Sequence, residues 1–308
     1  MIESIQKYAK VGIIQGMLYP GVVFRMEDTL RELLLDEYWT SIEVPPMGDA
    51  ASRVRARRML ETAGVVASYV APPLLLGAGL NLNSLDAEER AKAVALLKMG
   101  VDEAYDYGCI DMSILAGKFE KEKKADYRKA LVDSVLEVCE YAKSQGDLKI
   151  ALEIFDYDVD KCVIIGPADE AADFAKDICK SVDNFGLLLD HSHLPLTHET
   201  PEFAVNAVKD YLIHAHIGNN VKPELPKDTP VYGDQHPRFG FPGGANGEAE
   251  LVDYLRNLLA VGFLNEKDPP ILSFEVKPTG AGTMLGFEDP GLVAANVKRM
   301  LNRAWAMV

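Results

Sequence analysis

The chain has 308 residues, of which 48% are hydrophobic and 26% are charged, and this is the composition of a folded globular protein rather than a disordered one. Its formal net charge of −15, from 32 basic and 47 acidic side chains, argues against nucleic acid and anionic membrane surfaces as partners. No apolar run approaches the ~20 residues of a membrane span, and the first residues lack a signal-peptide core. We therefore expect a cytoplasmic protein that does not enter a membrane.

Eight apolar or β-branched segments alternate along the chain with helix-like segments. Strands are expected near residues 10–18, 41–46, 65–73, 109–117, 149–156, 185–193, 211–219 and 271–278. Helices are expected near 26–37, 86–107, 166–181, 201–208, 247–261 and 290–306, with two more that end near Gly64 and Ser144. This alternation, without a GxGxxG motif after the first strand, predicts an α/β fold with a closed (β/α)8 barrel, formed by a single domain over residues 1–308.

Charged side chains stand at or near the ends of four of these apolar strands. They are Glu153 in KIALEIFD, Asp190 in FGLLLDHSH, His216 in YLIHAHIGN and Glu275 in ILSFEVKP. An unpaired charge inside an apolar strand costs several kcal/mol, so these groups need partners. Three carboxylates and one imidazole suit a divalent cation, most naturally Mn²⁺, with Mg²⁺, Co²⁺ or Zn²⁺ as alternatives. Buried salt bridges to Arg238 or Lys277 are the competing interpretation.

In their order along the chain, Glu153, Asp190 with His193 three residues later, His216 and Glu275 resemble the metal-site sequence of the xylose isomerase-like TIM barrels. The resemblance covers nearly the whole chain and is clearest over residues 149–278. It implies a metal that holds two adjacent oxygens of a sugar. It also implies that Glu153 and Glu275 serve both as metal ligands and as acid/base groups, and that His193 contacts or polarises a substrate oxygen.

Four further residues are candidates for substrate binding. His214 precedes His216 by two residues and so shares its strand face, where it either lines the site or is a core histidine. Lys277 directly follows the last ligand strand. His236 and Arg238 lie in GDQHPRFG, within the irregular stretch Gly218–Asn246 after the seventh strand. Loops this long are usually functional or disordered, and this one is expected to be a lid or a partner-docking arm. His191 is expected to be a loop residue.

The sequence supports several functions to different degrees. The first is a metal-dependent enzyme that abstracts a proton next to a sugar carbonyl, with isomerisation or epimerisation of a keto-sugar as the outcome. The long proline-rich loop is similar to that of the large subunit of the C-glycoside deglycosidases, which implies, as an alternative, a lyase that cleaves a 3-oxo C-glycoside with a small β subunit. The net charge of −15 argues against an AP endonuclease-like activity on DNA. The presence of all four predicted metal ligands argues against a non-catalytic sugar-binding barrel. An oligomer is expected.

Overall fold

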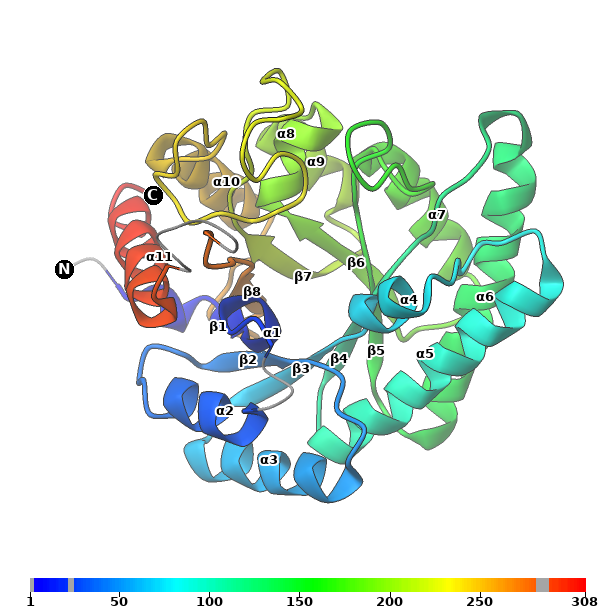
Figure 1. The fold of residues 1–308 in the computed structure, drawn as a ribbon, viewed down its shortest axis with the longest axis horizontal. Helices are drawn as coiled ribbons and strands as arrows, with labels where there is room; N and C mark the ends of the chain where they lie inside the picture. Colours follow the sequence, from blue (N-terminus) through cyan, green and yellow to red (C-terminus); the bar gives the residue numbers. More distant parts are fainter. Residues whose placement is uncertain (1–2, 22–24, 281–287) are drawn as a thin grey trace.

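Eight strands in the described part of the chain form one closed barrel. The computed structural model describes residues 3–21, 25–280 and 288–308. The strands are β1 (Lys10–Ile14), β2 (Ser41–Val44), β3 (Val66–Val70), β4 (Asp111–Leu115), β5 (Lys149–Glu153), β6 (Phe185–Asp190), β7 (Leu212–Ile217) and β8 (Ile271–Phe274). Each pairs in parallel with the next, and β8 pairs with β1 to close the ring (Figure 1). The predicted (β/α)8 barrel is confirmed.

Helices surround this barrel and connect its strands. They are α1 (Gln15–Leu18), α2 (Met26–Leu34), α3 (Ala50–Ala63), α4 (Pro72–Ala78), α5 (Ala87–Tyr107), α6 (Lys124–Gln145), α7 (Ala168–Ile178), α8 (Leu194–Thr197), α9 (Pro201–Val208), α10 (Glu248–Ala260) and α11 (Pro290–Trp305), with short 3₁₀ helices η1 (Ile5–Lys7), η3 (Lys121–Lys123) and η4 (His191–His193). Among the helices of the described residues, none is both long and apolar enough to cross a membrane.

All eight predicted strands extend too far at their C-terminal ends, and in three of them the predicted strand runs into a helix. The chain turns into α1 after β1, into α4 after β3 and into η4 after β6. The turns after β1 and β3 are largely apolar, and the turn after β6 is polar but buried; hydrophobic periodicity does not distinguish a short buried helix from the end of a buried strand. His191 accordingly lies in η4 rather than in an open loop, and its side chain is buried.

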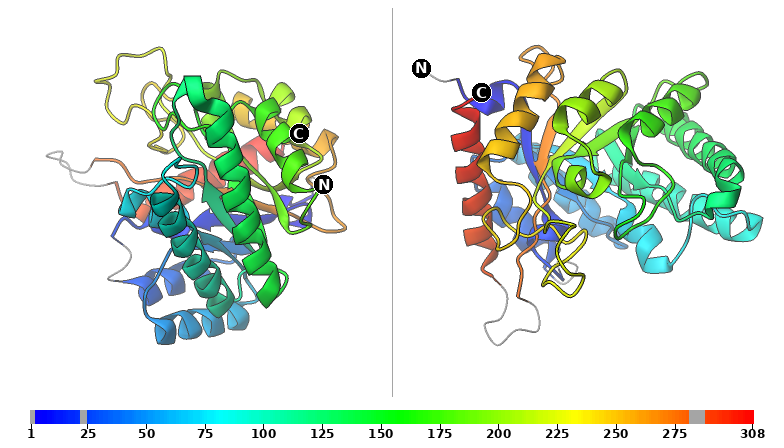
Figure 2. Two further views of the ribbon diagram at one scale, coloured as in Figure 1. Left: turned by 90° about the vertical axis from the view of Figure 1, so that its right-hand side faces the viewer. Right: turned by 90° about the horizontal axis from the view of Figure 1, so that it is seen from above.

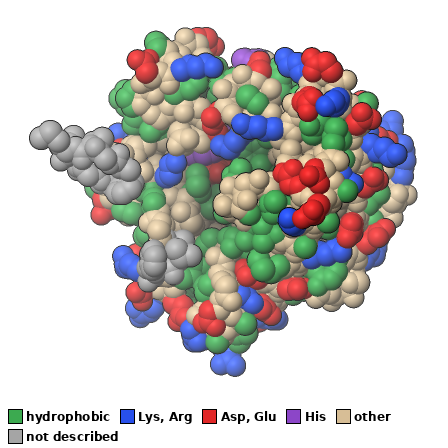
Figure 3. Space-filling model, turned by 45° about the vertical axis from the view of Figure 1, so that its right-hand side comes forward, with side chains coloured by type: hydrophobic (Ala, Val, Ile, Leu, Met, Phe, Trp, Pro, Cys, Tyr) green, Lys and Arg blue, Asp and Glu red, His purple; other side chains and the backbone are tan. Residues whose placement is uncertain are grey.

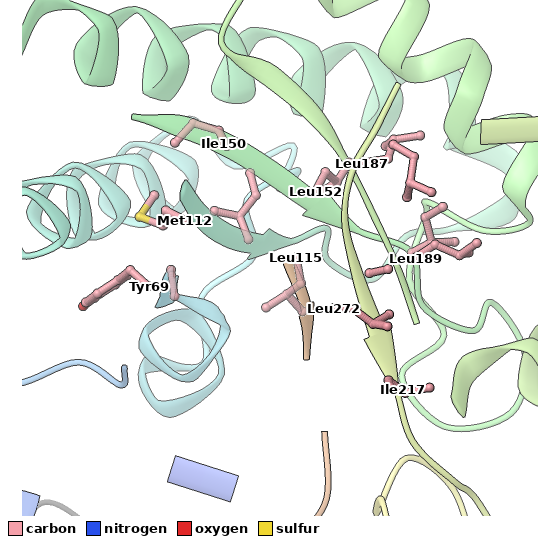
Figure 4. Close-up of a cluster of buried hydrophobic side chains, with 14 of the residues drawn as sticks. Tyr69, Met112, Leu115, Ile150, Leu152, Leu187, Leu189, Ile217 and Leu272 are labelled. Atoms are coloured by element: carbon pink, nitrogen blue, oxygen red, sulfur yellow. The ribbon is translucent and has the colours of Figure 1, made fainter. Parts of the chain in front are cut away.

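The main hydrophobic core lies between the barrel and the outer helices. Figure 4 labels nine of its side chains, each at most 4% exposed: Tyr69, Met112, Leu115, Ile150, Leu152, Leu187, Leu189, Ile217 and Leu272. Successive strand residues point to opposite faces, so Leu152 and Glu153 at the end of β5 have opposite orientations. The strands thus bury one set of side chains under the helices and direct the alternate set into the barrel.

The barrel interior is narrow and contains small polar residues. A Cβ atom on Gly12 would lie 2.4 Å from Oγ of Ser273 and 3.1 Å from the backbone oxygen of Ser41. This close contact between β1, β2 and β8 leaves no room for a side chain at Gly12, and active sites of this architecture are built further along, at the C-terminal ends of the strands.

The connection from β7 to α10, residues 218–247, is the longest irregular segment of the described chain. It stands out from the barrel, at the upper left in the left view of Figure 2. The first described residues lie beside α11, where the Trp305 indole donates a 2.7 Å hydrogen bond to the backbone oxygen of Glu3.

Candidate active site

Four ligand-type side chains converge at the C-terminal end of the barrel. Glu153 ends β5, Asp190 ends β6, His216 lies near the end of β7, and Glu275 directly follows β8. Asp190 and His216 are register partners on adjacent strands. One donor atom from each of the four residues lies within 4.8 Å of the others, and all four side chains are buried or nearly so. The structure therefore brings together the four residues that the sequence nominated; we call them the ligand quartet.

The chemistry of the quartet fits a divalent cation. Oε1 of Glu153 is buried without a hydrogen-bond partner among the described residues and lies 3.7 Å from Nδ1 of His216. Burial and then the charge of Glu275 raise the pKa of Glu153 to about 6. Three buried carboxylates repel one another unless a cation or protons compensate them. Carboxylate oxygens are hard ligands and imidazole nitrogen is a borderline ligand, so the quartet could hold a divalent metal.

A row of buried charges lies beneath His216 and orients it. Nε2 of His216 lies 3.0 Å from Oε1 of Glu43 on β2, so this nitrogen donates to the carboxylate and Nδ1 faces the quartet. The same Glu43 oxygen lies 3.1 Å from Nε2 of His214, whose Nδ1 lies 2.9 Å from Oδ2 of Asp111. A histidine held in this way presents one fixed nitrogen to a metal.

The sequence left His214 either lining the site or in the core, and the structure places it in the core instead of at the predicted substrate contact. The imidazole is fully buried between two carboxylates and does not line the cavity, so it cannot contact a substrate there. Burial opposes its charged form, but Glu43 and Asp111 raise the pKa of His214 to about 9. Sequence reasoning missed Glu43 and Asp111. The criterion applied to the quartet would have found them, because each is a carboxylate in a short apolar strand, SIEV and DMSIL.

A second buried cluster stands beside the quartet. His193 donates from Nδ1 to the backbone oxygen of Ile154 at 2.8 Å, and its Nε2 lies 3.0 Å from Oδ1 of Asp234. Because both ring nitrogens are engaged and the residue does not line the cavity, the structure does not support the predicted direct contact of His193 with substrate. His193 instead holds Asp234 in place, and it lies 3.6 Å from Oδ2 of Asp190.

The long loop supplies residues to the site. Its Asn220 side-chain oxygen accepts hydrogen bonds from the backbone N–H groups of Gln235 and His236, at 3.2 and 3.3 Å. His236 Nε2 then lies 2.6 Å from Oδ1 of Asp234 and 3.4 Å from Oε1 of Glu275. Burial opposes its charged form, but Asp234 and Glu275 raise the pKa of His236 to about 9. The segment around residues 234–236 is thus part of the site.

A cavity of about 550 Å³ opens above these groups. Its polar side is lined by Glu153, His216, Asp234, Gln235, His236, Glu275, Lys161 and Lys277. Its other side is apolar and comes from the segments after β1, β2 and β3, including Met17, Pro46, Val70 and Leu74. Figure 3 shows a hollow in one face of the molecule, with histidine visible in it and hydrophobic side chains along its walls.

Lys277 and Arg238 have different positions relative to this cavity. Lys277 lines it, with Nζ 3.0 Å from Oε1 of Gln235, and burial lowers its pKa. The Arg238 guanidinium pairs with Glu288 at 2.7 Å and does not line the cavity. The predicted contact of Arg238 with substrate is therefore not supported, because its charge is already neutralised on the flank of the loop.

A protein-family model described as "Xylose isomerase-like TIM barrel" matches residues 32–286, which is most of the chain. The chain belongs to this family. The match spans all four quartet residues and the loop that contributes His236, so the resemblance stated from the sequence is confirmed at the level of the family. A search of curated proteins finds no match.

Solved structures similar to this xylose isomerase-like barrel include several sugar epimerases. An L-ribulose 3-epimerase has a TM-score of 0.70 at 18% identity, over 96% of this chain and 95% of the other. A D-psicose 3-epimerase from Clostridium cellulolyticum H10 has a TM-score of 0.64 at 18% identity, over 96% of each chain. A 3-keto-D-glucoside 4-epimerase from E. coli has a TM-score of 0.66 at 12% identity, over 96% of this chain and 99% of the other. At these identities the likeness establishes the shared fold.

Proposed function

We propose that the protein is a divalent-metal-dependent sugar enzyme that abstracts a proton next to a carbonyl and so epimerises or isomerises a keto-sugar. The observation that carries the proposal is the pair Glu153 and Glu275, two carboxylates in one ligand quartet at the floor of a cavity. The names of the similar structures support it, because an L-ribulose 3-epimerase and a D-psicose 3-epimerase act on ketoses.

The quartet residues and the loop divide the chemistry between them. When bound, a divalent metal supplies a Lewis acid that polarises the sugar carbonyl. One carboxylate of the pair Glu153 and Glu275, in its ionised form, accepts the proton from the adjacent carbon, and the other, in its protonated form, returns a proton to the enediolate; the product then depends on the carbon and the face that receive it. His236 lines the cavity with Nε2 beside Asp234 and Glu275, so its positive charge faces the substrate. Lys277 presents its ammonium group to a second oxygen. Mn²⁺ remains our preferred metal.

Solvent exchange tests this proposal directly. The wild-type protein with Mn²⁺ in D₂O is expected to incorporate deuterium next to the carbonyl of a ketose such as D-fructose or L-ribulose, followed by mass spectrometry. Glu153→Gln and Glu275→Gln should each abolish the exchange, because a carboxamide can neither accept nor return the proton at neutral pH. Glu202→Gln, an exposed glutamate on α9, is the control and should exchange like wild type. Exchange that survives in both active-site variants would refute the assignment.

A second candidate is a lyase in which the same enolate expels a group from an oxidised glycoside. The extensive apolar side of the cavity favours it, because a free ketose carries hydroxyl groups on nearly every carbon. One similar structure also bears the name of a 3-keto-D-glucoside enzyme. In this form the chain is the large subunit of a C-glycoside deglycosidase, and the 218–247 loop is where a small β subunit docks.

The two candidates differ in what the isolated chain does. An epimerase converts a free ketose without a partner, whereas the lyase cleaves a 3-oxo C-glycoside only after a small β-rich subunit is co-expressed. Assays of the chain alone and of the two-chain mixture, on both substrate types, separate them. Rapid epimerisation by the chain alone discards the lyase, and cleavage confined to the mixture discards the epimerase.

A further inference from the structure

A second cavity adjoins the catalytic one. It has a volume of about 510 Å³ and lies among the segments that follow β3, β4 and β5. Both cavities are lined by Leu76 and Lys161, so these two side chains lie at the boundary between them. The remaining walls are largely apolar and include Leu75, Leu80, Leu82, Leu115, Ala116 and Val163. An apolar cavity with few polar groups that adjoins a reaction site has the character of a ligand subsite.

Side-chain amides hold two walls of this second cavity together. The Asn83 side chain donates from Nδ2 to the backbone oxygen of Lys118 at 2.8 Å and accepts from the backbone N–H of Gly117 at 2.5 Å. Asn81 donates to the same Lys118 oxygen at 2.9 Å. The segment after β3 is thereby fixed to the segment after β4, which in turn forms an isolated bridge between Lys118 and Val163.

The third wall is ordered by one carboxylate. Asp156 accepts backbone hydrogen bonds from four consecutive residues, 159–162, at 2.8 to 3.2 Å. This turn delivers Lys161 to the junction of the cavities, where its Nζ lies 2.7 Å from Oδ2 of Asp234. Asp234 also holds His193 and His236, so the junction is rigidly connected to the catalytic groups. A cavity with fixed walls binds a ligand without a large ordering cost.

We propose that the second cavity is a binding subsite for an apolar, ring-bearing substituent of the substrate, so that the natural substrate is a keto-sugar that carries such a substituent and a free ketose is a poorer substrate for the same proton transfer. The inference rests on the proposed sugar chemistry of the quartet. A free monosaccharide has no apolar group to bury against the leucine side chains of this cavity. An aromatic substituent gains binding free energy in proportion to the apolar area it buries. The substituent crosses the junction between Leu76 and Lys161, and the sugar ring lies over the quartet.

Binding of simple glycosides tests the subsite without requiring turnover. 2-Naphthyl β-D-glucopyranoside and methyl β-D-glucopyranoside are titrated into full-length Glu153→Gln protein by calorimetry, and the naphthyl compound should bind at least tenfold more tightly. Leu80→Asp places a charge in the second cavity at a partly exposed position and should remove most of that preference. Leu85→Asp, at a 39% exposed leucine that lines neither cavity, should retain it.

The possible outcomes are distinct. If Leu80→Asp lowers stability, Leu76→Asp at the 55% exposed junction leucine repeats the test, with circular dichroism showing that the variant is folded. Equal affinities for the two glycosides in the parent protein, or equal loss of the preference in the Leu80 and Leu85 variants, would overturn the subsite. Failure of the proton-transfer proposal would appear in deuterium exchange and would leave these affinities unchanged.

Discussion

Glu43 on β2 and His216 on β7 meet inside the barrel, with Oε1 of the glutamate 3.0 Å from Nε2 of the histidine. The contact joins strands that are far apart in the ring and decides which imidazole nitrogen faces the ligand quartet. Glu43→Gln is expected to weaken metal binding by about 10- to 100-fold, because an amide neither fixes the tautomer nor raises the basicity of the histidine as a carboxylate does.

Calorimetric titration with Mn²⁺ measures this effect, and Asp111→Asn provides a graded comparison. Asp111 contacts His214 and not His216, so its change should weaken metal binding less than that of Glu43. Equal affinity in wild type and Glu43→Gln would show that Glu43 does not position the ligand.

Purified protein is expected to carry about one divalent metal per chain, because the carboxylates of the quartet need a compensating charge. Glu275→Gln and His216→Ala should each lose most of it, as measured by elemental analysis after mild purification. Chelation of wild type should lower its melting temperature, since a ligand present at about 100 times its Kd stabilises the folded state by about 2.7 kcal/mol. Unchanged metal content in both variants would exclude the quartet as the binding site.

His236 and Arg238 are two residues apart but should differ in function. His236→Ala removes a group that lines the cavity and contacts Asp234, and we expect kcat/KM on the true substrate to fall by about 100-fold. Arg238→Ala breaks a partly exposed pair with Glu288, so activity should change less than about threefold and stability by about 1 kcal/mol or less. Steady-state kinetics with thermal unfolding distinguishes the two, and equal losses of activity would contradict this division.

His191 makes the fold sensitive to acid. Its imidazole stacks on Tyr254 with centroids 4.9 Å apart, and burial lowers the pKa of His191 to about 3. Because the folded pKa lies below the unfolded value near 6.5, the unfolded state binds the proton first, and stability is lost as pH falls from about 6.5 toward about 3. The loss approaches about 1.4 kcal/mol per pH unit in that window.

Urea unfolding at pH 7 and pH 5 tests this linkage. His191→Phe can retain the stacking but cannot take up a proton, so its stability should fall less between the two pH values than that of wild type. His198→Asn, at a half-exposed histidine with φ of 60° where asparagine is tolerated, should keep the wild-type difference. An unchanged pH dependence in His191→Phe would remove His191 as its source.

Gly12→Ala tests the tightness of the barrel interior. The added methyl group would meet the Ser273 hydroxyl and the Ser41 backbone, and overpacking of this kind costs about 1 to 3 kcal/mol. Gly48→Ala is a matched control, because nothing lies within 4 Å of a Cβ at that position. Denaturant unfolding of the two variants gives the comparison, and similar stabilities would mean that the interior relaxes more easily than its geometry indicates.

The sequence alone determined the barrel and the quartet, and the physical reason is the same for both. Parallel strands buried on both faces are apolar runs, so their number and order can be read directly. A carboxylate or histidine at the end of such a run stands out because burial without a partner is costly. Since active sites of this fold gather at the C-terminal ends of the strands, Glu153, Asp190, His216 and Glu275 could be nominated without coordinates.

Tertiary structure alone decided what each remaining polar residue contacts. Strand alternation puts His214 and His216 on the same face of β7. Only the closure of the barrel, which brings Glu43 and Asp111 from distant strands, places His214 beneath the quartet and His216 within it. The hydrogen bonds that Asn220 accepts from the loop backbone bring His236 to the cavity, whereas Arg238 pairs with Glu288. Because a loop has no regular spacing of apolar residues, neither contact can be predicted from a local sequence pattern. Such contacts depend on packing between segments far apart in sequence.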